Sequence, residues 1–210
     1  MKKPRIALVN YGMGNLRSVE KALETTGASV SVTNQSQDIK NADGVVLPGV
    51  GAFGEAVKHL QDEKLWDTLK QVIEDKKPFL GICLGLQLLF ESSEEASKVK
   101  GLEIFKGKVI QFKSKSLKVP HMGWNTLEKQ QKASWALAGI QSEDYFYFVH
   151  SYFPVPTNKK IVATKTNYGK DFCSAIGTDS LFASQFHPEK SGTLGLKILK
   201  NYVKKVSSCS

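Results

Sequence analysis

One cysteine stands between two glycines at the end of an apolar run, in the segment GICLGLQ at residues 81–87. The spacing G-x-C-x-G is the thiol version of the nucleophile elbow G-x-S-x-G, in which a sharp strand-to-helix turn presents the nucleophile. Gly81 and Gly85 have no Cβ atoms, so a strand and a helix can pack closely around such a turn. Cys83 would then lie at a helix N-terminus, where unsatisfied amides and the helix dipole favour the thiolate. A small buried cysteine without a chemical role is the other interpretation that this segment alone allows.

A cysteine nucleophile needs a base to take its proton. Of the four histidines, His187 in the segment ASQFHPEKS is the best candidate for this base. It ends an apolar run, and Pro188 biases it to an extended conformation. Glu189 lies two residues further on and can point to the same side of an extended chain. An imidazole that a carboxylate orients can accept a proton on its other nitrogen, so Cys83, His187 and Glu189 form a candidate triad. The alternative is a surface strand end at which HPE occurs by chance.

The other three histidines have simpler interpretations. His59 lies in a charged helical stretch and is expected to face solvent. His150 alternates with aromatic residues in YFVHSYF, which predicts a core position or a pocket wall. His121, in VPHMGWN, follows a proline in a segment that we expect to be irregular.

An acyl-transfer site also needs hydrogen-bond donors aimed at the oxyanion. The backbone amide of Leu84, the residue after the nucleophile, is the donor that an elbow provides. The segment PGVG at residues 48–51 is a candidate for the second donor, because its two glycines permit a peptide to face the site. These glycines can equally serve only a tight turn.

These residues must be positioned by secondary structure, and the first half of the chain alternates strands with helices. Strands are predicted at residues 5–11, 29–33, 43–49 and 77–83, and helices at 15–27, 55–77 and 84–95. This alternation predicts a mostly parallel sheet with helices on both faces. Ligands of such sheets collect beyond the carboxyl ends of the strands, where YGMGN, PGVGAFG and GICLGLQ lie.

The second half is rich in strands, at residues 101–114, 144–155 and 160–188, before a closing helix at about 193–206. It predicts antiparallel additions to the same sheet. No linker, repeat or change of composition divides the 210 residues, so we expect one α/β domain over residues 1–210.

Composition limits the setting of this protein. Three cysteines without C-x-x-C spacing argue against a disulfide framework or a cysteine metal site and favour the cytoplasm. We expect no metal, no cofactor, no signal peptide and no contact with a membrane. The net charge of +9 favours anionic partners in general. The lysines are spread along the chain without an aromatic-interleaved basic stripe, which indicates solvated surface rather than nucleic-acid binding.

The order of these motifs resembles that of a known enzyme family. GICLGLQ, followed much later by FHPE, resembles the Cys-His-Glu triad of the class I glutamine amidotransferases, which have a flavodoxin-like fold. From about Arg5 to Lys204 the chain is similar to one branch, the glutaminase subunits of bacterial imidazole glycerol phosphate synthases. The motifs that carry this likeness are NYGMGNLRSV, LPGVGAFGEA, GICLGLQLLFESSEE, VPHMGWN, FVHSY and SQFHPEKSG.

The resemblance implies a role for further residues. Cys83, His187 and Glu189 would hydrolyse the side-chain amide of glutamine, and Leu84 with the Gly49–Val50 peptide would hold the oxyanion. In the family this second donor forms poorly until a partner binds its nucleotide. The residues implied to bind glutamine are Gly51, Gln87, Glu95, Ser151 and Tyr152, with Glu95 meeting the ammonium group.

The resemblance also implies a partner, a (β/α)8-barrel cyclase that uses the released ammonia to make imidazole glycerol phosphate and an aminoimidazole carboxamide ribotide in histidine synthesis. The residues implied to face it are Asn15, Arg17, His121, Met122, Trp124 and Asn125. Met122 and Trp124 would be costly to leave exposed in an irregular segment, and aromatic anchors are common at interfaces.

Three other functions stay open from the sequence. The first is a paralogous glutaminase that feeds another acceptor, in aminated-sugar or pyridoxal phosphate synthesis. The second is a stand-alone cysteine hydrolase or stress protein of flavodoxin-like fold, which would leave HPE and Gln87 unexplained. The third is a basic binding module without catalysis, which predicts salt-sensitive nucleic-acid binding.

Overall fold

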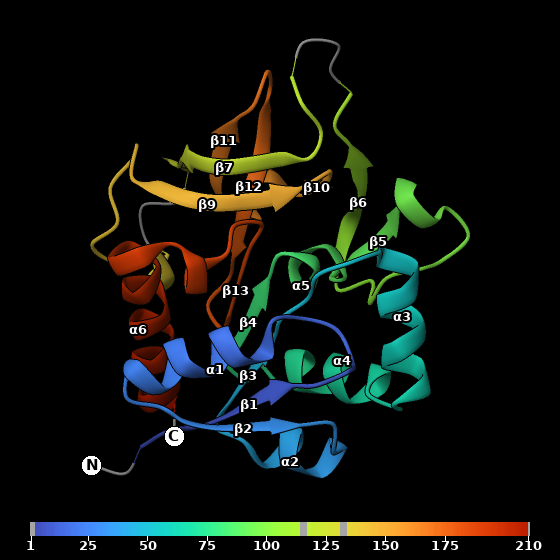
Figure 1. Cartoon of the computed structure of the whole chain (residues 1–210). Helices are drawn as coiled ribbons and strands as arrows, with labels where there is room; N and C mark the ends of the chain where they lie inside the picture. The colour runs from blue at the N-terminus through green and yellow to red at the C-terminus, as the bar shows by residue number, and fades with distance from the viewer. Residues whose placement is uncertain (1–2, 114–116, 131–133, 210) are drawn as a thin grey trace.

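An eight-stranded sheet forms the centre of the molecule, with the strand order β2-β1-β3-β4-β13-β12-β11-β8. The computed structural model describes residues 3–113, 117–130 and 134–209 (Figure 1). The first five strands of this order pair in parallel: β2 (Ser29–Thr33), β1 (Arg5–Val9), β3 (Gly44–Leu47), β4 (Phe79–Ile82) and β13 (Leu181–Ser184). The last three strands add in antiparallel: β12 (Asp171–Gly177), β11 (Val162–Asn167) and β8 (Glu128–Lys129).

Helices cover both faces of this sheet, because successive side chains of a strand point to opposite sides. Ile6 and Leu8 of β1 pack in one buried cluster with α1 (Leu16–Thr25) and α6 (Gly192–Cys209). Ala7 and Val9 of the same strand pack in a second cluster on the other face. The helices of that face are α2 (Ser36–Asn41), α3 (Phe53–Asp62) and α4 (Trp66–Glu74).

Two smaller sheets stand beyond the carboxyl ends of the parallel strands, at the top of Figure 1. One joins β10 (Tyr152–Pro156), β6 (Phe105–Gln111) and β5 (Phe90–Ser93). The other pairs β7 (His121–Thr126) with β9 (Tyr145–His150) in antiparallel. In the described part of the chain, the remaining elements are the short helix α5 (Leu84–Gln87) and four 3-10 turns at Glu94–Ala96, Trp135–Leu137, Lys159–Ile161 and Pro188–Lys190.

The predicted fold class is confirmed: the chain forms an α/β fold with a mostly parallel sheet, helices on both faces and antiparallel additions. The closing helix is also present, three residues longer at its C-terminal end than expected. Over the described part of the chain, no helix combines the length and the apolar character that crossing a membrane requires.

The single helix predicted over residues 55–77 is wrong, because the chain forms α3 and α4 there. Lys64 between them has a φ of 57°, in the left-handed region that ends a helix. Leu65 is fully buried and is the N-cap residue directly before α4. The chain therefore turns at Leu65 so that this side chain is buried, although the charge pattern and helical spacing of residues 55–77 did not predict a break.

Two more predicted segments are wrong in their structure. The helix expected over residues 84–95 ends after one turn, because the carbonyls of Leu88 and Leu89 accept hydrogen bonds from the N–H groups of Leu102 and Phe105 in a later segment. The chain continues as β5, which pairs with β6. The segment VPHMGWN at residues 119–125, expected to be irregular, forms from residue 121 onward the regular strand β7.

Candidate active site

Cys83 lies in a strained turn between β4 and α5. Its φ is 54° and its ψ is −105°, a conformation that non-glycine residues rarely adopt and that persists where the surroundings enforce it. The two flanking glycines allow this turn. A Cβ atom on Gly85 would overlap the carbonyl oxygen of Leu47 in β3, and a Cβ atom on Gly81 would lie 2.9 Å from Cβ of Ala183 in β13. The geometry is that of a nucleophile elbow.

The sheet brings the late HPE segment to this elbow. β4 and β13 are parallel neighbours with Ile82 opposite Ser184, so the residues that follow both strands emerge at the same edge. The backbone N–H of Cys83 donates to the carbonyl of Ser184 over 2.7 Å. His187 follows three residues later, and its own N–H donates to the carbonyl of Tyr147 in β9 over 2.9 Å. The parallel register therefore joins residues that are far apart in the sequence.

His187 and Glu189 form a buried pair. Nδ1 of His187 lies 2.8 Å from Oε1 of Glu189, and both side chains are 2% exposed. Nε2 of His187 is buried and has no hydrogen-bond partner among the described residues, so this nitrogen can interact with the thiol of Cys83. Burial alone would lower the pKa of His187, but interaction with Cys83 and the hydrogen bond to Glu189 raise it above its ordinary value. The arrangement therefore favours an imidazolium beside the thiol.

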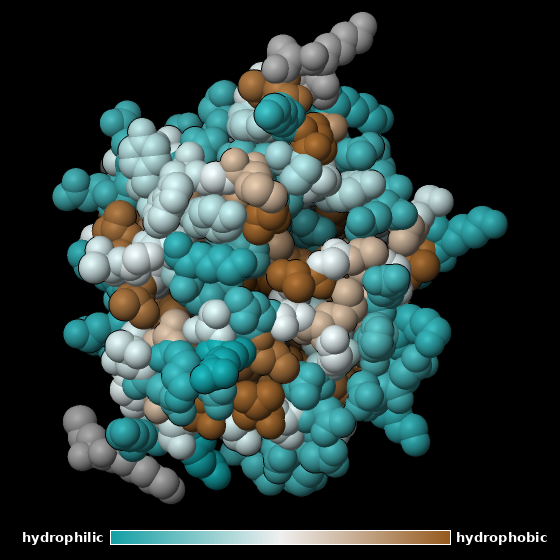
Figure 2. All heavy atoms as spheres, viewed as in Figure 1, coloured by the Kyte–Doolittle hydropathy of each residue, from teal (hydrophilic) through white to brown (hydrophobic). Residues whose placement is uncertain are grey.

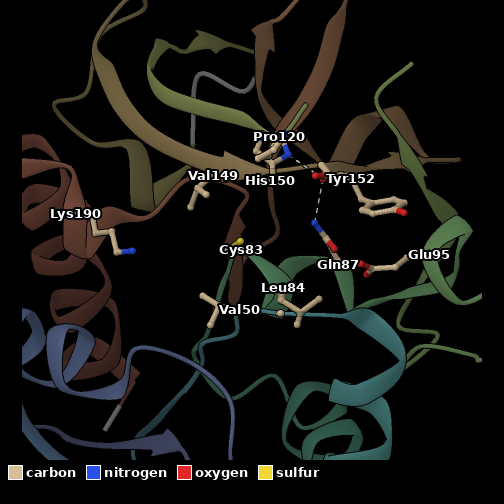
Figure 3. Close-up of a pocket in the computed structure, with 12 residues that line it drawn as sticks. Val50, Cys83, Leu84, Gln87, Glu95, Pro120, Val149, His150, Tyr152 and Lys190 are labelled. Atoms are coloured by element: carbon tan, nitrogen blue, oxygen red, sulfur yellow. Dashed lines mark hydrogen bonds between the residues drawn. The ribbon is translucent and has the colours of Figure 1, made fainter. Parts of the chain in front are cut away.

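A cavity of about 440 Å³ opens over Cys83 (Figure 3). In the figure, Gln87, Glu95 and Tyr152 lie to one side of the thiol, Val50 and Leu84 lie below it, and His150 lies above. The residues predicted from the sequence that line the cavity are Val50, Gly51, Cys83, Leu84, Gln87, Glu95, Ser151 and Tyr152. The structure thus brings the predicted nucleophile and the predicted glutamine-binding residues to one cavity.

Glu95 and Gln87 are each held by backbone groups. Oε2 of Glu95 accepts a hydrogen bond of 2.8 Å from the N–H of Phe53, the first residue of α3. Oε1 remains for a cationic ligand group. Nε2 of Gln87 donates to the carbonyl of Tyr152 over 3.1 Å and to Oε1 of Gln185 over 3.0 Å. Both amide protons of Gln87 are used, so Oε1 is the polar atom that it can offer to a ligand.

The two backbone groups expected to hold an oxyanion, Leu84 and the Gly49–Val50 peptide, are hydrogen-bonded to each other. The N–H of Leu84 donates to the carbonyl of Gly49 over 3.3 Å. The Gly49–Val50 peptide therefore turns its oxygen, rather than its N–H, toward Leu84. The hydroxyl of Tyr11 donates to the carbonyl of Pro48 over 2.9 Å and holds this segment from below. Neither donor is available to an oxyanion in this conformation.

Two buried histidines form a neutral pair above the cavity. Nδ1 of His150 lies 2.8 Å from the carbonyl of Tyr152 and must donate to it, so its Nε2 accepts from Nδ1 of His121 over 3.0 Å. Nε2 of His121 then accepts from the amide of Asn125 over 3.2 Å. Burial lowers the pKa of His150 to about 3 and that of His121 to about 4. Both imidazoles are thus neutral at pH 7.

The residues predicted to face a partner differ in their exposure. Met122 and Trp124 on β7 are 63% and 56% exposed, and Asn15 and Arg17 are exposed at the start of α1. The side chain of His121 is buried, so it supports β7 from behind instead of presenting a surface. Asn125 is half-buried.

Several residues at the cavity were not predicted from the sequence. Pro120, Val149 and Lys190 line it, and Nε2 of Gln185 lies 3.5 Å from Sγ of Cys83. Gln185 directly follows β13, and the parallel pairing of β13 with β4 brings it to Cys83. Its partner lies about one hundred residues away in the sequence, so no local pattern indicated this contact.

Solved structures share this architecture. The chain matches the structure of PurLQS from Thermotoga maritima with a TM-score of 0.74 and 18% identity, over 99% of both chains. It matches the glutaminase domain of Trypanosoma brucei CTPS with a TM-score of 0.68 and 17% identity, over 99% of this chain and 94% of the other. At these identities the likeness concerns the fold.

Sequence relatives are much closer. The chain is 52% identical over 203 residues to the imidazole glycerol phosphate synthase subunit HisH of Trichodesmium erythraeum, with 96% of this chain and 94% of the relative covered. It is 51% identical over 202 residues to the protein of the same name from Aquifex aeolicus, with 96% and 97% covered. Residues 7–206 match the family described as glutamine amidotransferase class-I. With this match over nearly its whole length, the chain belongs to the class I glutamine amidotransferase family.

Proposed function

We propose that this chain is the glutaminase subunit of an imidazole glycerol phosphate synthase. It hydrolyses glutamine and passes the ammonia to a (β/α)8-barrel cyclase subunit, which makes imidazole glycerol phosphate in histidine biosynthesis. The observation that carries the chemistry is a strained Cys83 that interacts with the buried His187–Glu189 pair and lines one cavity together with Glu95. Relatives about half identical over nearly the whole length support the choice of acceptor.

The reaction begins with a proton on His187 and a thiolate on Cys83, which the raised pKa of His187 favours. Sγ attacks the side-chain carbonyl carbon of glutamine to form a tetrahedral intermediate. The C–N bond then breaks and the nitrogen takes the proton from His187. Ammonia departs, and a thioester on Cys83 remains. Glu189 orients the imidazole through the 2.8 Å contact to Nδ1.

Hydrolysis of the thioester completes the cycle. His187, now neutral, takes a proton from water as the water oxygen attacks the thioester carbon. The C–S bond breaks, glutamate leaves, and the thiolate and imidazolium are restored. Within the cavity, we propose that the free carboxylate oxygen of Glu95 binds the ammonium group of glutamine and that Gly51, Gln87, Ser151 and Tyr152 hold the rest of the amino acid.

The oxyanion hole gives a reason for control by the partner. The N–H of Leu84 is engaged by the Gly49 carbonyl, so the Gly49–Val50 peptide has to rotate before two donors face the oxyanion. We propose that binding of the cyclase and its nucleotide favours the rotated form. The proposed contact surface comprises Asn15, Arg17, Met122, Trp124 and Asn125, with His121 supporting β7 from behind.

This proposal treats the whole chain as one catalytic domain that works in the cytoplasm. Cys83, Cys173 and Cys209 are all free thiols, as a reducing compartment allows. No cofactor enters the mechanism, since a thiol, an imidazole and water supply every step.

Glutamate release from glutamine tests the proposal, with the purified chain alone and then mixed with a bacterial cyclase and the nucleotide ligand of that cyclase. We expect low activity alone and a rise of at least about 10²–10³-fold in the mixture, because each oxyanion donor that is restored contributes about that factor. Cys83→Ala should abolish glutamine-dependent synthesis and leave ammonia-dependent synthesis by the complex intact. High activity of the chain alone, or none with the cyclase, would contradict the proposal and point to another acceptor.

A further inference from the structure

The buried amide side chain of Gln185 touches the nucleophile. Gln185 follows β13 directly and is 0% exposed. Its Nε2 lies 3.5 Å from Sγ of Cys83, within hydrogen-bonding distance for sulfur. The backbone N–H of Gln185 donates to the carbonyl of Ser174 in β12 over 2.8 Å, which fixes the origin of the side chain. The contact therefore joins two well-anchored residues.

The surrounding hydrogen bonds decide which end of the Gln185 amide faces the sulfur. A backbone carbonyl only accepts, so the carbonyl of Tyr152 requires the NH2 group of Gln87. The same NH2 group lies 3.0 Å from Gln185, and it requires the oxygen of that amide as its acceptor. Gln185 consequently turns its own NH2 group toward Cys83. With the Gln185 amide flipped, two NH2 groups would face each other without an acceptor, so the hydrogen bonds from Tyr152 through Gln87 exclude that orientation.

We propose that Gln185 is a further catalytic residue of the glutaminase reaction, which donates a hydrogen bond to the Cys83 thiolate and stabilises it each time it forms. This inference rests on the proposed function, since it concerns the same nucleophile. His187 gives up its proton during the cycle, whereas the amide of Gln185 does not titrate and remains a donor throughout. Its bond is strongest when the sulfur is charged, before attack and when the thioester is cleaved.

The competing explanation is that Gln185 only satisfies Gln87 and fills space. Two substitutions separate these roles. Gln185→Met keeps a long unbranched side chain and removes the donor. Gln185→Glu keeps the shape and an acceptor for Gln87, but replaces the donor with an oxygen that destabilises a nearby thiolate. A purely structural role predicts no change in the acidity of Cys83 from a folded variant.

The test is the rate at which iodoacetamide alkylates Cys83 in the full chain as a function of pH, with the modified residue identified by mass spectrometry of peptides. Only the thiolate reacts, so the profile reports the apparent pKa of Cys83. We expect this pKa to rise by about one pH unit in Gln185→Met and by at least as much in Gln185→Glu, because a hydrogen bond to a charged group is lost. The alkylation rate near pH 7 should then fall about tenfold.

The control variant is Gln37→Met, on the exposed surface of α2, which should keep the wild-type profile. Thermal unfolding identifies the variants that fold, and if Gln185→Met does not, the isosteric Gln185→Glu decides. An unchanged profile in a folded variant would overturn the proposal. A shifted profile in a chain that never hydrolyses glutamine, even with the cyclase, would support the role of Gln185 at the thiol while refuting the proposed function.

Discussion

At the residue scale, burial and charge act on His187 in opposite directions. Removing the imidazole from water lowers its pKa, while Cys83 and Glu189 raise it, and the second effect prevails. His150 is also buried but faces a carbonyl and another neutral imidazole, and its pKa falls to about 3. Two histidines in the same pocket region thus hold opposite protonation states, which suits one for proton transfer and the other for structure.

This contrast predicts the effect of Cys83→Ser on His187. A serine hydroxyl stays neutral, so the largest interaction that raises the pKa of His187 is lost while burial remains. The imidazole should therefore lose its proton at a lower pH in the variant than in the wild-type chain, with Glu189 still opposing the shift. The measurement is an NMR titration of the ring protons of His187. An equal or higher pKa in Cys83→Ser would show that the thiol does not govern His187.

At the scale of elements, the elbow depends on the close approach of α5 to β3. Gly85→Ala would place a methyl group against the carbonyl of Leu47 and force the two elements apart. We expect a loss of roughly 1–3 kcal/mol in the free energy of unfolding from the overpacking. Glutaminase activity of the complex should fall by roughly 10²-fold, because Cys83 moves with the helix. Urea unfolding and glutamate release measure the two effects.

Gly27→Ala is the matched control for that variant. Gly27 follows α1 with a φ of 99°, and a Cβ atom there would meet no other atom within 4 Å. The substitution strains the backbone without touching the elbow, so it should cost about 1 kcal/mol of stability and leave activity intact. If both variants lost activity in proportion to stability, the close approach at Gly85 would have no specific catalytic importance.

The features that could be predicted from the sequence are those that residues close together in the chain determine. The elbow and the His187–Glu189 pair were predictable, since backbone rules act over a few residues and the parallel sheet joins strand ends. The one-turn length of α5 was not, because Leu88 to Phe90 are buried by contacts with distant segments. Gln185 was missed for the same reason, since its partners Gln87 and Cys83 lie on another strand-turn-helix unit.

At the scale of the whole molecule, exposed hydrophobic side chains gather beside one pair of strands. Six large hydrophobic residues are exposed in the described part of the chain, and four lie on or next to β7 and β9: Val119, Met122, Trp124 and Tyr145. Figure 2 shows pale and brown side chains among the hydrophilic ones on the upper part of this face. Exposed apolar groups of this kind mark interaction sites, so this one fits the docking surface proposed for the cyclase.

Trp124 is the side chain of this group best suited to anchor the proposed cyclase. Its ring packs edge-on against Tyr147 at 6.1 Å between centroids and is thereby held in place before binding. We expect Trp124→Ala to weaken the complex by about 2 kcal/mol or more, roughly a 30-fold rise in Kd. The free energy of unfolding should change by about 0.5 kcal/mol or less, because most of the side chain already faces water. Isothermal titration with the cyclase measures the first quantity, and urea unfolding measures the second.

Val32→Ala is the control for that experiment, since Val32 is an exposed apolar residue on the edge strand β2, at the opposite end of the molecule in Figure 1. It should leave the Kd unchanged. If Trp124→Ala matched Val32→Ala, the group at β7 would not be the docking surface. If Trp124→Ala instead lost stability and affinity together, the ring would be part of the packing of β7 on β9. Only a loss of affinity in a stable chain fits a docking surface whose strand is supported from behind by His121.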